Sequence, residues 1–268
     1  MIERCTDERN IEAAILYIGD AFKKTPYLYA NIKKYGCGND RIKVWIDFEE
    51  EADTIQGIYL LYYDCLHFFT RTNEKYEIEK ALDMIQQLAP KVVMVQGDFG
   101  KRLEQDLNEI FEIERNHVID MDKVGVDKTG FRSEVGVRED ISQIVSLLLE
   151  DPEYRDVYER EILTDQMFDR FDGNFSTYFI VRMDDKVVAS CSTYGEVEGF
   201  ALLGGVIVHP DYRRRGLAAD VENFACHYLT GQGISVVGFV NFNNTASLQL
   251  HEKLGAVAIS TLFKFVRK

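Results

Sequence analysis

The segment HPDYRRRGLAAD, residues 209–220, places three arginines directly before a glycine in a strongly acidic chain. The 268 residues include 31 lysines and arginines against 45 aspartates and glutamates, for a formal net charge of -14. An apolar run precedes the segment and apolar residues at helical spacing follow it, which predicts a strand joined to a helix. The amino end of a helix exposes unpaired N–H groups and a partial positive charge, so we expect this segment to bind an anion.

Two small residues make the anion-binding prediction specific. Gly216 has no side chain and Ala218 almost none, so an anion can approach the backbone itself. A solvated charge cluster is the alternative, but cations at the start of a helix oppose its dipole, and a bound anion explains them better. The chain has no G-x-x-x-x-G-K-[ST] motif, so the segment is not a P-loop. We therefore expect a pyrophosphate cradle of another kind.

Composition limits the class of protein. Hydrophobic residues make up 46% of the chain, which is enough for a packed core. No apolar run approaches the roughly 20 residues of a membrane span, and the charged start MIERCTDERN lacks the apolar core of a signal peptide. The five cysteines are scattered and form no C-x-x-C pair. These features predict a cytoplasmic protein without a membrane partner, and the acidity argues against nucleic acid.

The two halves of the chain show related patterns. From residue 133 onward, periodicity and turn residues predict the order β-α-α-β-β-β-α-β-α-β, with Gly204 and Gly205 marking a bulge inside one strand. The first half predicts three strands, within residues 41–48 and 54–71, followed by helix, strand and helix. This parallel suggests a diverged duplication. With a boundary in the segment 124–132, we expect an α/β domain over residues 1–125 and a second domain over residues 126–268.

The second half resembles a known superfamily. The predicted strand and helix are joined by H-P-x-Y-R-R-R-G-L-A, which is similar to the acyl-CoA signature of the GNAT N-acetyltransferases. That signature is Gln/Arg-x-x-Gly-x-Gly/Ala, and Arg213, Gly216 and Ala218 match it. Asn244, opening a helix that ends in HEKLGA, is similar to a second landmark of that superfamily. The resemblance covers roughly residues 133–268. It implies an α/β fold with a GNAT-like mixed, largely antiparallel twisted sheet flanked by helices, in two tandem related domains, the first of them degenerate.

The resemblance also implies an activity and its cofactor. The expected reaction moves an acetyl group from acetyl-CoA, a cosubstrate, to a primary amine by direct attack in a ternary complex, without a metal. The strand ending at Val208 is expected to hold the pantetheine arm, and an N–H group near it to polarise the thioester carbonyl. The cofactor-binding candidates are Val206, Ile207, Val208, Arg213, Arg214, Arg215, Gly216, Leu217, Ala218, Ala219, Asn241, Asn244 and Ser247.

Catalytic candidates depart from the pattern of the superfamily. His251 stands where the usual L-Y-E-K-L-G run has a tyrosine that protonates the departing thiolate, and a histidine can also donate a proton. A helix-face histidine without a catalytic role is the equal alternative. The strand segment ALLGGV lacks the glutamate that often acts as base, so the candidates are Glu196 and Glu198 just upstream. Cys65 and His67 form C-x-H without a second ligand pair, which makes a metal site improbable.

A second function stays open at this stage. The missing strand glutamate and the histidine at position 251 are also compatible with a non-catalytic CoA-binding regulatory or sensor module. The first half has no glycine in the turn of FFTRTNEKYE, so we expect it to have lost cofactor binding. It would then shape the acceptor cleft or carry the contacts of a homodimer. The identity of the amine is open, because acceptor loops vary on one fold.

Overall fold

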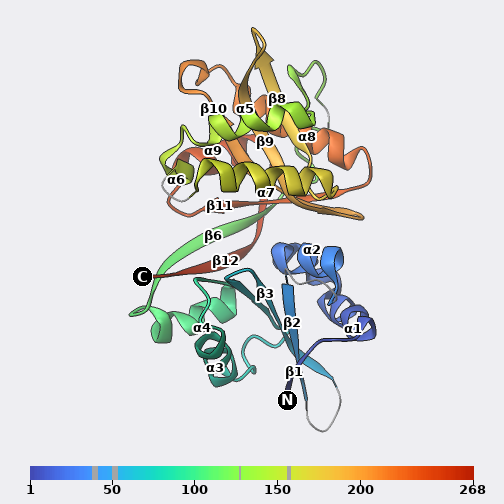
Figure 1. The fold of residues 1–268 in the computed structure, drawn as a ribbon, viewed down its shortest axis with the longest axis vertical. Coiled ribbons are helices and arrows are strands. Elements are labelled where there is room, and N and C mark those ends of the chain that lie inside the picture. The colour runs from blue at the N-terminus through green and yellow to red at the C-terminus, as the bar shows by residue number, and fades with distance from the viewer. Residues whose placement is uncertain (38–41, 50–53, 127, 156–157) are drawn as a thin grey trace. The chain divides into compact units, whose positions relative to one another are not determined.

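The computed structural model describes residues 1–37, 42–49, 54–126, 128–155 and 158–268 (Figure 1). The chain forms two compact units. Unit 1 consists of Met1–Ile119, Phe239–Leu248 and Ala258–Lys268, and unit 2 of Asp120–Gly238 and Gln249–Val257. The sequence predicted one boundary, between residues 125 and 126. In the structure the last segment of the chain belongs with the first half instead.

Unit 1 is a mixed sheet between helices, with the strand order β1-β2-β3-β4-β5-β12-β6. Strands β4 and β5 run parallel, from Cys65 opposite Val92 to Phe68 opposite Val95. Its elements are β1 (Ile2–Arg4), α1 (Glu8–Ile18), η1 (Gly19–Lys24), α2 (Pro26–Tyr35), β2 (Ile42–Phe48), β3 (Ile55–Tyr62), β4 (Cys65–Phe69), α3 (Ile78–Leu88), β5 (Val92–Gln96), α4 (Gly97–Leu107), β6 (Phe111–Asp120) and β12 (Val257–Arg267).

Unit 2 repeats this architecture, with the strand order β11-β10-β9-β8-β7. Here β10 and β11 are the parallel pair, from Phe200 opposite Ser235 to Leu203 opposite Gly238. Its elements are β7 (Ser133–Val135), η2 (Arg138–Asp140), α5 (Ile141–Leu148), α6 (Pro152–Arg155), α7 (Arg160–Asp172), β8 (Tyr178–Met183), β9 (Lys186–Val197), β10 (Phe200–Val208), η3 (Pro210–Tyr212) and α8 (Leu217–Thr230), with β11 (Ser235–Asn241) up to Gly238 and α9 (Thr245–Leu254) from Gln249.

Apolar residues alternate between the two faces of the unit 1 sheet, so helices cover both. On one face, Tyr59 and Phe68 pack with Phe99 of α4. On the other face, Ile58 and Leu60 pack with residues of α1 and α2. In unit 2, α5 and α7 cover one face in a cluster of their own. Each unit therefore has its own hydrophobic core, as a domain requires.

The last strand belongs to unit 1 because its apolar face fits there. Strand β12 pairs antiparallel with β5, from Leu262 opposite Gln96 to Val266 opposite Val92. Gly100 makes this possible, since a Cβ atom on it would lie 2.7 Å from Phe263. Helix α4 can therefore pack directly on the strand.

The predicted fold class is confirmed: the sheets are mixed, largely antiparallel and flanked by helices. The predicted order of the second half is present, with the four-residue α6 in addition. Helices α1 and α2 and strands β1 and β6 had not been predicted. Strand β6 alternates poorly because Arg115 and His117 stand at positions that an apolar residue would normally fill. It is stabilised instead by Lys264, whose Nζ lies 3.1 Å from Glu114, and by Arg115 over the Phe263 ring.

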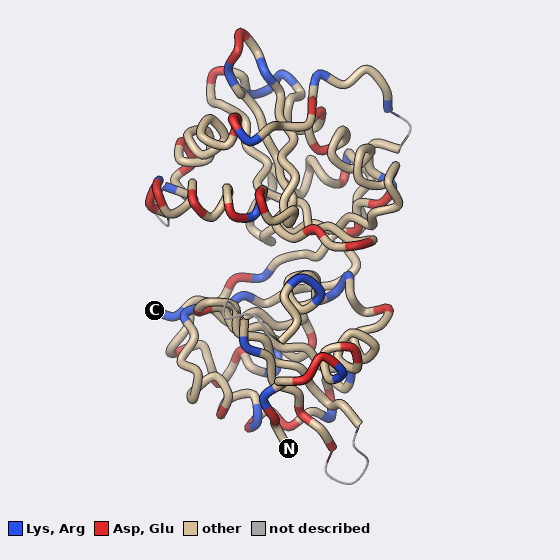
Figure 2. Tube along the Cα trace, turned by 45° about the vertical axis from the view of Figure 1, so that its right-hand side comes forward, with Lys and Arg blue, Asp and Glu red and all other residues tan. Residues whose placement is uncertain are grey.

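Figure 2 shows basic and acidic residues interspersed along the chain. In the described part of the chain, no helix has the length and apolar character that crossing a membrane requires.

Candidate functional site

A bulge interrupts strand β10 at its two glycines. The pairing of β10 with β9 shifts register between Gly204 and Ile207, and Gly205 has a φ of 64°. The Tyr194 ring lies directly against this backbone, since a Cβ on Gly204 would lie 2.7 Å from the ring. A Cβ on Gly205 would lie 2.5 Å from the Tyr194 hydroxyl. Only glycine fits both positions, as the sequence predicted for a bulge or a close approach.

The bulge also marks the point where the parallel ladder stops. The pairing of β10 with β11 ends at Leu203 opposite Gly238, whereas β10 continues to pair with β9 up to Val208 opposite Ala189. Backbone groups of residues 204–208 on the β11 side therefore lie outside the described ladder. An extended ligand can hydrogen bond to such an edge as an added strand does.

The segment after β10 forms the predicted turn into a helix. Strand β10 ends at Val208, η3 spans Pro210–Tyr212 and α8 begins at Leu217. Gly216 is the N-cap residue, with a φ of 75°, a conformation that favours glycine. It makes no side-chain cap, so the first N–H groups of α8 are not covered by a capping side chain. Gly216 is exposed, Ala218 and Ala219 are half-buried, and the Leu217 side chain is in the core.

The three arginines differ in what holds them. Arg213 donates from Nε to the Val208 carbonyl at 3.1 Å. Arg215 donates to the Asp211 carbonyl at 3.0 Å and lies 4.9 Å above the Tyr212 ring. Arg214 has a φ of 60° and is exposed. Two of the three arginines thus hold the turn in place, while Arg214 extends from it.

A fourth arginine at this turn was missed by the sequence analysis. Arg132, just before β7, donates to the Arg215 carbonyl at 3.2 Å, and its Nη2 lies 3.8 Å from where a Cβ on Gly216 would be. Its backbone N–H and the Ser133 hydroxyl both donate to Asp220, at 3.0 and 2.6 Å. This engagement draws the acidic side chain of the first turn of α8 toward β7. No local sequence pattern predicts that Arg132 contacts this turn, because it is more than eighty residues away in sequence.

Two tyrosine hydroxyls meet beside the bulge. The Tyr194 and Tyr154 hydroxyl oxygens are 2.8 Å apart, and either can be the donor. Ser192 Oγ lies 3.6 Å from the position of a Cβ on Gly205, on the same side. A hydroxyl both donates and accepts, so this pair can pass a proton. Sequence spacing could not show the pair, because forty residues separate its members.

His251 of α9 is buried against a glutamate. Its Nε2 lies 2.7 Å from Oε1 of Glu222, and the side chains are 10% and 2% exposed. The other carboxylate oxygen of Glu222 is buried and has no hydrogen-bond partner among the described residues. Glu222 also contributes, after burial, to raising the pKa of the Cys191 and Cys226 thiols well above the usual range. The two cysteines are therefore inert thiols of the core.

Residues 142–256 match the family model described as "Acetyltransferase (GNAT) family". This segment is a GNAT domain. No curated protein matches the chain significantly.

Solved GNAT structures resemble the whole chain in fold. A GNAT-family acetyltransferase from Colwellia psychrerythraea has a TM-score of 0.64 and 14% identity, with 100% of each chain covered. A tandem GNAT protein from the clavulanic acid biosynthesis pathway has a TM-score of 0.62 and 11% identity, over 100% of this chain and 98% of that one. A GCN5-related N-acetyltransferase from Sphaerobacter thermophilus has a TM-score of 0.60 and 14% identity, over 100% and 96%. The tandem GNAT fold is thus shown for the chain.

Within the GNAT domain, the two candidate bases lie near the start of β10. Glu198 is in the turn before Phe200, and the strand from Phe200 to Val206 spans roughly 20 Å. Glu196 pairs with Ala201, and its carboxylate accepts the hydroxyls of Thr177 and Thr193 at 2.8 and 3.1 Å. Thr193 itself pairs with Leu203, next to the bulge. The catalytic role of either glutamate stays a prediction.

The remaining candidates of the GNAT signature lie elsewhere. Val206 and Val208 are half-buried on β10, and Ile207 points into the core. Asn241, Asn244 and Ser247 belong to unit 1, where the Asn244 side chain accepts from the Ser247 N–H at 3.0 Å. Their contribution to the cofactor site stays a prediction. Within the described residues, no group of three or more His, Cys, Asp or Glu side chains is arranged to hold a metal ion.

Proposed function

We propose that this protein is an acetyl-CoA-dependent N-acetyltransferase that transfers the acetyl group to a primary amine by direct attack in a ternary complex. The observation that carries the proposal is the path from the β10 bulge to the glycine-capped start of α8, within a GNAT domain. The bulge and the open strand edge suit the pantetheine arm. The amino end of α8 suits the pyrophosphate.

The cofactor-holding groups are mostly backbone. Residues 204–208 would bond the pantetheine arm, with the N–H of Ile207 or Val208 polarising the thioester carbonyl. The N–H groups of residues 216–219 would bind the pyrophosphate, with Arg214 and Arg132 adding charge at the rim. No metal takes part in this scheme.

Tyr194 and Tyr154 would serve the incoming amine. A lysine-like amine has a pKa of about 10.4, so losing its proton costs roughly 4.6 kcal/mol at pH 7. The Tyr194 hydroxyl lies against the glycine backbone of the bulge, and the hydroxyl pair can relay the proton of the amine to solvent. This proposal gives two tyrosines the role of base for which the sequence offered Glu196 and Glu198.

His251 would serve the leaving group. The amine nitrogen attacks the carbonyl carbon, the carbon–sulfur bond breaks, and the thiolate takes up a proton. His251 can donate that proton, while Glu222 holds the imidazole in one orientation through Nε2. The carboxylate acts on the imidazole only, so Glu222 is a positioning residue.

We also propose a cytoplasmic location, which the five scattered cysteines without a C-x-x-C pair support. The proposed activity is tested by following thiol release from acetyl-CoA with a panel of amines, alongside melting temperature with acetyl-CoA or CoA. Release that depends on the amine is expected. No change in melting temperature at millimolar ligand would reject the cofactor. Binding without release across the panel would favour the regulatory module instead.

A further inference from the structure

Unit 1 contains a cavity of about 770 Å³, within the range of small-molecule sites. It opens where the parallel ladder of β4 and β5 ends, at Phe68 opposite Val95. Ligands of α/β proteins commonly bind outside the carboxyl ends of parallel strands. Residues 258–261 of the last segment form another wall of the cavity, and His117 and Phe242 stack at 4.0 Å on a third side. All of these residues belong to unit 1.

This cavity is not a second pyrophosphate cradle. The side chain of Arg102, a residue of α4, fills the turn between β4 and α3. Its guanidinium donates to the carbonyls of Asn73 and Tyr76. The Gln96 amide donates to the Thr70 carbonyl at 2.7 Å and to Asn73 Oδ1 at 2.6 Å. Gln96 therefore spans the gap beyond the ladder, where an extended ligand arm would have to lie.

Basic residues outnumber acidic residues in the lining of the cavity. Four basic residues line the cavity, Lys24, Arg71, Lys101 and Arg115, against the two acidic residues Asp98 and Glu104. The whole chain has the opposite excess, 31 basic residues against 45 acidic ones. A cavity that gathers positive charge in so acidic a protein is suited to an anion.

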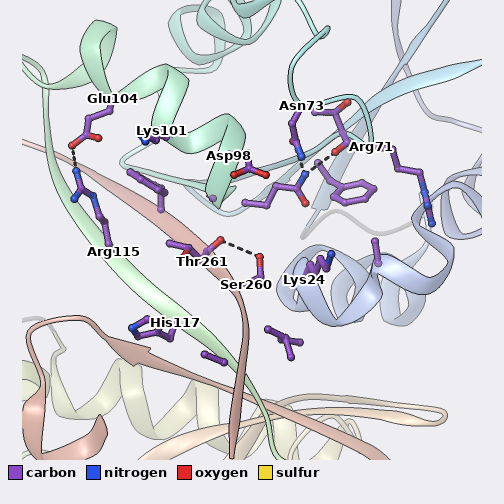
Figure 3. Close-up of a pocket in the computed structure, with 18 of the residues that line it drawn as sticks. Lys24, Arg71, Asn73, Asp98, Lys101, Glu104, Arg115, His117, Ser260 and Thr261 are labelled. Atoms are coloured by element: carbon purple, nitrogen blue, oxygen red, sulfur yellow. Dashed lines mark hydrogen bonds and ion pairs between the residues drawn. The ribbon is translucent and has the colours of Figure 1, made fainter.

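The basic residues form two pairs on opposite sides. Figure 3 shows Lys101 and Arg115 on one side of the cavity, and Lys24 and Arg71 on the other. In each pair the arginine is anchored: Arg115 to Glu104, and Arg71 to Asp20 at 2.6 Å and to the Ile18 carbonyl at 2.8 Å. Within the described residues, no hydrogen bond or ion pair engages the ammonium groups of the two lysines.

Helix α4 adds to the positive potential. Its N-cap residue is Gln96, whose side chain makes no cap and is turned toward Thr70 and Asn73. Gly97 begins the helix against β12, where a Cβ would lie 3.1 Å from the Thr261 carbonyl. The positive end of this 11-residue helix therefore borders the cavity. Asp98 lies between the two basic pairs in Figure 3 and disfavours an anionic group in the middle.

We infer that this cavity binds a small molecule with two anionic groups, carboxylates or phosphates, one at each basic pair. Asp98 accepts a hydrogen bond from a hydroxyl or amine on the body of that molecule. The stacked His117 and Phe242 rings offer an apolar surface to its flat part. The inference rests on unit 1 alone and does not depend on the proposed acetyl transfer.

Titration calorimetry at low salt with two probes, citrate and pyrophosphate, tests the inference and tells the carboxylate source from the phosphate source. We expect at least one probe to bind, and Lys24→Glu and Lys101→Glu each to weaken it roughly tenfold or more. Lys43→Glu is the matched control, because Lys43 is an exposed lysine on β2 outside the cavity. It should leave binding unchanged.

Gly216→Val separates this site from the α8 turn, which could also bind pyrophosphate. Probe binding that persists in Gly216→Val and falls in the two lysine variants supports the cavity. Loss of all binding in Gly216→Val, or equal binding in the lysine variants and the wild type, overturns it. So does the absence of binding by both probes at millimolar concentration. The melting temperature of each variant is measured. It should be unchanged for the lysine variants, whose altered positions are exposed, and lower for Gly216→Val, because a φ of 75° strains a β-branched residue.

Discussion

The Nε2 atom of His251 lies 2.7 Å from Oε1 of Glu222, and both side chains are almost completely buried. Removing the histidine leaves the buried Glu222 carboxyl group without its partner. His251→Phe should therefore lower the free energy of unfolding by about 3–5 kcal/mol. Denaturant unfolding followed by circular dichroism measures this, and a double variant with Glu222→Leu should recover part of the loss. An unchanged midpoint for His251→Phe would contradict the pairing.

His251→Gln separates stability from catalysis. The glutamine amide can still donate to Glu222, so this variant should stay close to the wild type in stability. It cannot protonate the thiolate, and turnover should fall about a hundredfold with little change in KM for acetyl-CoA. Wild-type turnover in His251→Gln would assign the histidine to structure alone.

The Tyr194 and Tyr154 hydroxyl oxygens are 2.8 Å apart. We expect that removing either hydroxyl lowers the reaction rate without weakening cofactor binding. Tyr194→Phe should lower kcat roughly a hundredfold and shift the pH–rate profile to higher pH, because the amine must then lose its proton unaided. Tyr154→Phe should have a smaller effect in the same direction. Tyr63→Phe is the control, since that tyrosine is 60% exposed in unit 1. A Tyr194→Phe profile identical to the wild type would remove the relay.

We expect the pyrophosphate of the cofactor to bind at Gly216. Gly216→Asp places a side chain and a negative charge at the start of α8, at a φ of 75°, and should abolish the rise in melting temperature with CoA. Gly233→Asp is a matched control, because its φ is 76° and no other atom lies within 4 Å of its Cβ position. The two variants bear the same backbone strain in the same unit. If Gly216→Asp still responds to CoA, the cradle is elsewhere.

The burial of His67 in β4 should make the free energy of unfolding depend on pH. Burial lowers the pKa of His67 to about 4, from an ordinary value of 6.5. Between these values the unfolded chain binds a proton that the folded chain does not, so stability falls as the pH decreases. At 1.4 kcal/mol per pH unit, the loss reaches about 3 kcal/mol at pH 4.

Replacing the imidazole tests this dependence. His67→Leu should flatten the curve of unfolding free energy against pH between 6.5 and 4. His227→Gln removes an exposed histidine and should leave the curve as it is. A His67→Leu curve as steep as that of the wild type would show that other groups cause the slope.

Elements with a clear period were predictable, and those supported by distant contacts were not. The strand over Ile42–Phe48 alternates apolar and polar residues, so its position could be predicted. Strand β6 carries Arg115 and His117 in its middle. Its stability comes from contacts with Phe263 and Lys264, which lie about 150 residues away.

The cradle was readable from six neighbouring residues, because a helix start and a glycine with positive φ are local properties. The same holds for the bulge at Gly204 and Gly205. Tertiary structure decided which distant groups reach these sites: Arg132 at Gly216, Tyr154 with Tyr194, and Glu222 with His251. It also decided that the last strand completes the sheet of the first half. Strand pairing and burial depend on packing between segments that are remote in sequence. The spacing of residues within one segment cannot predict that packing.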